Sequence, residues 1–141
     1  MSARDEILDN IVTTLSAITG IAEVTKARVQ SASWGANERW AKVALFTDSE
    51  TATPRMGCNI WDYFWTVGVA VFYKGENAQQ EIHDLMQPIR EAMLNGASLT
   101  RGGHAWNTHY TGSAPIEDTF ADDRNAAAIV MNFQVHYREN Y

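Results

Sequence analysis

The sequence predicts an α+β domain with a mixed, largely antiparallel sheet and two helices packed on one face of it. Two segments carry apolar residues at helical spacing, and five others carry strand patterns. They follow one another in the order α-β-β-β-α-β-β, so most strands are consecutive in the chain. Because consecutive strands tend to pair with each other, this order favours an antiparallel layer over alternating parallel units.

Length and composition predict one domain over residues 1–141, folded around a single core. No stretch approaches the roughly 20 apolar residues that span a bilayer, so no membrane is expected as a partner. The acidic N-terminus differs from a signal peptide and the single cysteine, Cys58, has no partner in the chain, which together favour folding in a reducing cytoplasm. The net charge of -6 is opposite to that of a nucleic-acid-binding surface.

Two amphipathic helices are expected. The first has its apolar face at Ile7, Leu8, Ile11, Val12, Leu15 and Ile18, and the second at Ile82, Leu85, Met86, Ile89 and Met93. Ser2 with Asp5, and Asn77 with Gln80, resemble capping boxes at their N-termini. Gly20 is placed as a left-handed C-terminal cap of the first helix.

The five strands are predicted at 23–30, 40–47, 60–73, 104–111 and 126–137. The first is polar on both faces, so we place it near an edge of the sheet. In the third, Trp61, Tyr63, Trp65, Val67, Val69, Val71 and Tyr73 share one face, which is expected to be core. Three tryptophans on strands, Trp61, Trp65 and Trp106, are expected to pack inward.

The strand at 60–73 is long for so small a domain. Fourteen residues extend roughly 46 Å, whereas a compact domain of this size is roughly 37 Å across. Either a bend or bulge at Gly68 folds the strand around the core, or one end projects and lays aromatic side chains on a neighbour. Both readings remain open from the sequence.

Two long loops are predicted, at 47–59 and 111–125. The second mixes apolar side chains with acids, as a docking arm does, although for any single one of these residues a place in a solvated acidic loop is the more common case. We therefore expect an interface at the loops and at one tryptophan, comprising Trp34, Arg55, Ile116, Glu117, Asp118, Phe120, Asp122, Asp123 and Arg124.

No catalytic, cofactor-binding or metal-binding residue is predicted, and the chain is not expected to be an enzyme. There is no Gly-x-Ser-x-Gly motif and no phosphate-binding glycine loop. His104 and His109 are five positions apart on a predicted strand, so their side chains should point to opposite faces. Cys58 is expected to be a packed thiol.

The stretches "WTVGVAVFYKGENAQQEIHDLMQPI" and "VMNFQVHYREN", together with the size and the order of elements, resemble the tail terminator (tail completion) proteins of long-tailed bacteriophages. The similarity covers nearly the whole chain and includes no diagnostic motif, so no single residue's role is carried over. The resemblance implies a homo-oligomeric ring, usually a hexamer of six copies, that caps the tail tube and provides the head–tail joining surface.

The expected partners are therefore other copies of the chain, the major tail tube protein and the head–tail connector protein, with DNA passing through without sequence-specific binding. The expected location is the virion, at the neck of the tail, after synthesis in the host cytoplasm. Two alternatives remain: another phage neck or adaptor protein, or a small-ligand-binding or enzymatic α+β domain with an aromatic pocket.

Overall fold

The computed structural model describes residues 3–25, 41–55, 57, 59–74, 77–115 and 126–140. A five-stranded sheet in the order β1-β2-β3-β5-β4 is the main element of the fold. Helix α1 and strands β1 to β3 come first in the chain, and α2, the 3-10 segment η2, β4 and β5 follow. Their bounds are α1 Ala3–Ser16, β1 Ile21–Thr25, β2 Ala41–Pro54, β3 Ile60–Lys74, α2 Ala78–Leu94, η2 Gly96–Gly103, β4 Asn107–Pro115 and β5 Ala126–Asn140.

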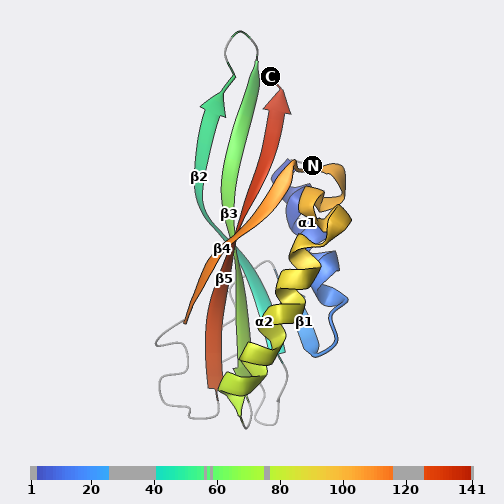
Figure 1. Cartoon of the computed structure of the whole chain (residues 1–141), viewed down its shortest axis with the longest axis vertical. Coiled ribbons are helices and arrows are strands. Elements are labelled where there is room, and N and C mark those ends of the chain that lie inside the picture. The colour runs from blue at the N-terminus through green and yellow to red at the C-terminus, as the bar shows by residue number, and fades with distance from the viewer. Residues whose placement is uncertain are drawn as a thin grey trace.

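Both helices lie on the same face of the sheet, as predicted (Figure 1). The core forms between this face and the helices, because alternate strand residues and the apolar helix stripes point toward each other. Its largest members are Trp65, Phe133, Ile7, Ile11, Leu15, Leu45, Ile89, Met93 and Met131, each at most 1% exposed. The apolar faces predicted for both helices are confirmed, and the fold class is the predicted α+β layer.

The sheet is antiparallel except at one edge. Strand β3 pairs with β5 without a break in register, from Ile60 opposite Asn140 to Lys74 opposite Ala126. Strand β2 pairs with the other side of β3, and β4 pairs with β5. Strand β1 runs parallel to β2 as a short edge strand, so the edge position predicted for the first strand is confirmed.

No bulge interrupts β3 at Gly68, which lies opposite Asn132 in the continuous register. The irregularities occur in the neighbouring strands instead, where the register shifts between Thr47 and Glu50 of β2 and between Tyr110 and Gly112 of β4. At about 3.3 Å per residue, the 15 residues of β3 extend roughly 50 Å. Of the two readings of this strand, the structure therefore agrees with a projecting end.

The projecting end consists of three strands. We call it the tip, and it comprises Thr51–Pro54 of β2, Ile60–Phe64 of β3 and Arg138–Asn140 of β5. The tip extends past both helices (Figure 1). All of its residues are described, and none of them is buried.

The predicted loop at 47–59 is wrong for most of its length, because β2 continues as a strand to Pro54. The polar residues of this segment are typical of a loop, but they pair with the end of β3 that lies in the tip. The tip has no core, so polar side chains are compatible with a strand there. In the loop predicted at 111–125, residues 111–115 belong to β4, and 116–125 lie outside the described residues.

Two predicted caps are also corrected. Asn77 precedes α2 with a left-handed backbone (φ 60°) and makes no side-chain cap, while the Gln80 amide donates to Asp84 Oδ1 at 2.8 Å. The first helix ends at Ser16, so Gly20 (φ 100°) serves the turn into β1 instead of capping the helix. Ser2 lies outside the described residues, which leaves the first capping box untested.

Trp65 is 1% exposed, as the prediction of a core residue requires, and Trp61 is partly buried. Trp106 is 59% exposed, so its predicted inward packing is wrong. The reason is that β4 begins only at Asn107, which leaves Trp106 outside the alternation of the strand. Trp34, Trp40 and Cys58 lie outside the described residues.

Candidate functional site

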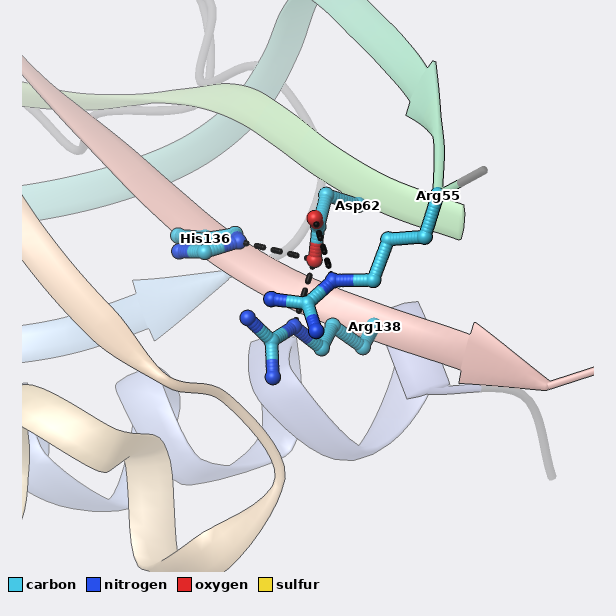
Figure 2. A network of polar contacts seen from close by, with 4 residues as sticks. All are labelled: Arg55, Asp62, His136 and Arg138. Atoms are coloured by element: carbon cyan, nitrogen blue, oxygen red, sulfur yellow. Dashed lines mark hydrogen bonds and ion pairs between the residues drawn. The ribbon is translucent and has the colours of Figure 1, made fainter. Parts of the chain in front are cut away.

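A cluster of polar side chains lies in and next to the tip (Figure 2), on the sheet face opposite the helices, because its strand residues alternate with the core-packed Tyr63 and Tyr137. Asp62 is its centre, accepting a hydrogen bond from Arg138 Nε at 2.5 Å and another from Arg55 Nε at 3.1 Å. His136 Nε2 lies 3.3 Å from the same carboxylate. We call these four residues, Arg55, Asp62, His136 and Arg138, the Asp62 cluster.

Strand register brings the cluster together. Asp62 pairs directly with Arg138 on β5, and His136 lies two residues earlier on the same face of that strand. Arg55 follows the last residue of β2, and its backbone N–H donates to the carbonyl of Ile60 at 2.9 Å across the end of the hairpin. Residues distant in the sequence therefore meet because β2, β3 and β5 extend together.

The cluster holds Asp62 as an anion. The hydrogen bond from Arg138, reinforced by those from Arg55 and His136, lowers the pKa of this carboxyl to about 2, although partial desolvation opposes the shift. A carboxylate with so low a pKa is a poor proton acceptor at neutral pH, which suits a binding or structural role better than general base catalysis. Two guanidinium groups around one carboxylate also leave the cluster with excess positive charge in a chain of net charge -6.

The titration of Asp62 gives an expected pH dependence. Because its folded-state pKa is depressed below the ordinary value of 3.8, its contribution to stability is present above about pH 4 and disappears as the pH falls toward 2. We expect Asp62→Asn to be less stable than the wild type at pH 7 and the difference to shrink between pH 4 and 2. Urea unfolding at several pH values measures this, and a difference that stays constant down to pH 2 would contradict it.

Aromatic rings flank the cluster on two sides. Phe64 stacks on His136 with ring centroids 4.5 Å apart, and the guanidinium carbon of Arg138 lies 3.7 Å from the ring centroid of Trp106. The Trp106 backbone N–H donates to the carbonyl of His136 at 2.6 Å, which fixes the segment after η2 against β5. An exposed tryptophan is thereby held beside an arginine at the edge of the tip.

On the helix face, a second polar network connects α1 to the extended strands. Tyr137 donates to Glu50 Oε1 at 2.6 Å and accepts from Arg4 Nε at 3.1 Å, and Arg4 also pairs with Glu50. Burial is the main cause that raises the pKa of Tyr137 to about 12. Arg4 also lies over the ring of Trp65, 4.8 Å from its centroid. This network supports the base of the tip and leaves the Asp62 cluster on the outer face.

Within the described residues, no group of three or more His, Cys, Asp or Glu side chains could hold a metal ion. His104 lies outside β4, with Nδ1 3.0 Å from Glu6, and His109 is exposed beside Asn107. No helix in the described part of the chain has the length and apolar character of a membrane span.

A pocket of about 540 Å³ lies against the C-terminal half of α2, lined by Gln87, Arg90, Glu91, Leu94 and Asn95. None of these residues is Trp or Tyr. The pocket is therefore not the aromatic one that the ligand-binding alternative predicts.

Of the interface residues predicted from the sequence, the structure places Arg55 in the Asp62 cluster. Trp34, Ile116, Glu117, Asp118, Phe120, Asp122, Asp123 and Arg124 lie outside the described residues. Sequence reasoning missed Asp62, His136, Arg138 and Trp106 as members of one site. One signal was present: Asp62 is the only charged residue between Ile60 and Tyr73. No protein-family model matches the chain, and no curated protein matches it either.

Proposed function

We propose that this chain is a structural virion assembly protein, a ring-forming tail terminator that caps the phage tail tube and provides the head–tail joining surface. In this proposal the chain associates with five further copies of itself into a ring of six and contacts the major tail tube protein and the connector. DNA passes through the ring without sequence-specific binding, and the finished ring is located at the neck of the virion.

The tip is the observation that carries the proposal. Three strands run past both helices, and the partly buried side chains of Trp61, Tyr63 and Phe64 lie on two faces of this extension. Extended aromatic strands cost solubility in a free subunit, whereas in an assembly they are covered by a neighbour.

The two ends of the sheet differ, which supports a ring. One end carries the tip with its arginines, and the other is covered by helices and joins β4 to β5 through the acidic segment 116–125. Unlike surfaces at opposite ends suit a heterologous, head-to-tail interface, and such an interface forms a ring when the rotation between neighbouring subunits closes. The net charge of -6 also agrees with a channel that conducts DNA without gripping it.

Gel filtration with light scattering, followed by electron microscopy, tests the proposal. We expect a ring with a central channel, and rings attached to the ends of tubes when the major tail tube protein is present. A strict monomer at high concentration, with and without tube protein, would overturn it. A ring found elsewhere in the neck of an intact particle would favour the adaptor alternative.

A further inference from the structure

The exposed ring of Trp106 lies beside Arg138 of the Asp62 cluster, to which Arg55 also belongs. We call these three residues the Trp106 patch. Trp106 is 59% exposed, the highest-exposure large apolar side chain in the described part of the chain. Tryptophan and arginine are the residue types that most often dominate the affinity of protein interfaces.

Arg138 has hydrogen-bonding capacity to spare. Its Nε donates to Asp62, its guanidinium carbon lies over the ring of Trp106, and 22% of its side chain is exposed. No described residue accepts a hydrogen bond from its Nη1 or Nη2. Asp62 and Trp106 hold the guanidinium in place, so its two terminal nitrogens are preorganised to bind a carboxylate in a bidentate manner.

We propose that the Trp106 patch docks the segment 116–125 of a neighbouring copy of this chain. The occupant follows from charge and chemistry, since "IEDTFADDRN" carries four acidic side chains against one basic. Its carboxylates can pair with Arg138, and Phe120 or Ile116 can pack on the exposed ring of Trp106. This inference names the contact within the proposed ring and so rests on the proposed function.

Chain length excludes docking of the segment on its own subunit. Arg138 follows Ile129, the residue opposite Pro115, by nine positions and follows Ala126 by twelve. It therefore lies roughly 30 Å from the end of β4 and roughly 40 Å from the start of β5. The ten residues 116–125 are attached to Pro115 at one end and to Ala126 at the other, so they would need roughly 70 Å of chain to reach Arg138 and return. Fully extended, the chain from Pro115 to Ala126 spans at most about 40 Å. The contact must be between two copies.

The contact joins unlike surfaces of two copies, the patch at one end of the sheet and the segment at the other. Each subunit offers one patch and one segment, so the contact can repeat from copy to copy until a ring closes. A pair of copies could also satisfy both contacts at once as a closed dimer. The docking contact is compatible with either assembly, and only the ring belongs to the proposed function.

Two variants of the full chain test the docking. In the patch variant, Trp106→Ala and Arg138→Gln remove the ring and the charge. In the segment variant, Glu117→Gln, Asp118→Asn, Asp122→Asn and Asp123→Asn neutralise the acids. We expect either variant to weaken self-association by about tenfold to a hundredfold, measured by sedimentation velocity. Arg90→Gln is the matched control, because Arg90 also lies over an aromatic ring, 5.5 Å from the centroid of Tyr110, but on the helix face.

Mixing the two variants gives the decisive measurement. The patch variant keeps an intact segment and the segment variant keeps an intact patch, so one good contact remains between them. We expect the mixture to form 1:1 complexes that do not grow further. Circular dichroism and the urea midpoint of each variant confirm that it is folded, and Trp106→Ala alone serves as a milder second patch variant.

The outcomes separate the two proposals. A folded patch variant that assembles like the wild type, or a mixture that forms no complex, overturns the docking contact and leaves the ring proposal standing wherever the wild type forms rings. A wild type that forms only closed dimers, with complexes in the mixture, overturns the tail terminator proposal and supports the docking contact.

Discussion

Replacing Phe133 with alanine is expected to lower the free energy of unfolding by about 3 to 5 kcal/mol. Phe133 is fully buried on the helix face of β5, opposite Val67 and beside Tyr110, whose ring centroid is 5.3 Å away. Removing the ring loses its transfer free energy and leaves a cavity between the sheet and the helices, which cannot close fully. Urea unfolding monitored by circular dichroism measures the loss.

Phe64 provides the matched control, because it has the same side chain on an adjacent strand but on the opposite face. It is only partly buried, and its main ring contact is the stack on His136 at 4.5 Å. We expect Phe64→Ala to cost about 1 kcal/mol. Equal losses for the two variants would mean that the outer face is packed as tightly at Phe64 as it is at Phe72, which is 1% exposed, and the tip would then not be an open surface.

Much of the fold could be predicted because periodicity reports burial. The stripe of Ile7, Ile11 and Leu15 and the alternation of Met131, Phe133 and Val135 each have one face in the core, so their patterns identified both the element and its orientation. The extension of β2 could not be predicted. Its residues Glu50–Pro54 pair with a projecting strand and bury little, and without burial a strand leaves no apolar alternation in the sequence.

The candidate site was harder to predict than the fold. Arg55, Asp62 and Arg138 are brought together by the register of three strands, and register depends on pairing that no local pattern specifies. The lone acid at position 62 within an apolar run marked one member, because a charge on a strand face requires a partner or solvent. The exposure of Trp106 was missed because its neighbours "HAWNTHYT" read as strand from the first residue.

The other large stability effect concerns Arg101, a fully buried arginine in η2. Its Nη2 donates to the carbonyl of Met93 and its Nη1 lies 3.4 Å from the sulfur of the same residue. Burial lowers the pKa of this guanidinium to about 10. Met93 is in the last turn of α2, where backbone carbonyls lack partners within the helix and carry partial negative charge. The Arg101 guanidinium donates a hydrogen bond to one of these carbonyls and so connects the end of α2 to η2.

We expect Arg101→Ala to cost about 2 to 4 kcal/mol, from the lost hydrogen bond at a buried carbonyl and the cavity left by the side chain. Arginine and alanine both have a Cβ, so the strain of the left-handed backbone at position 101 (φ 49°) is the same in the wild type and the variant. The loss of stability therefore reports the side chain alone. Arg90→Ala, at a partly exposed position on α2, should cost less than about 0.5 kcal/mol.

Because η2 leads directly to Trp106, the same substitution should also disturb the Trp106 patch. At urea concentrations where the variant is still folded, we expect weaker self-association than in the wild type, with the largest change in Trp106 fluorescence among the five tryptophans. Single-tryptophan replacements assign that signal. A stability loss with unchanged association would show that the backbone bond from Trp106 to His136 holds the patch without help from Arg101.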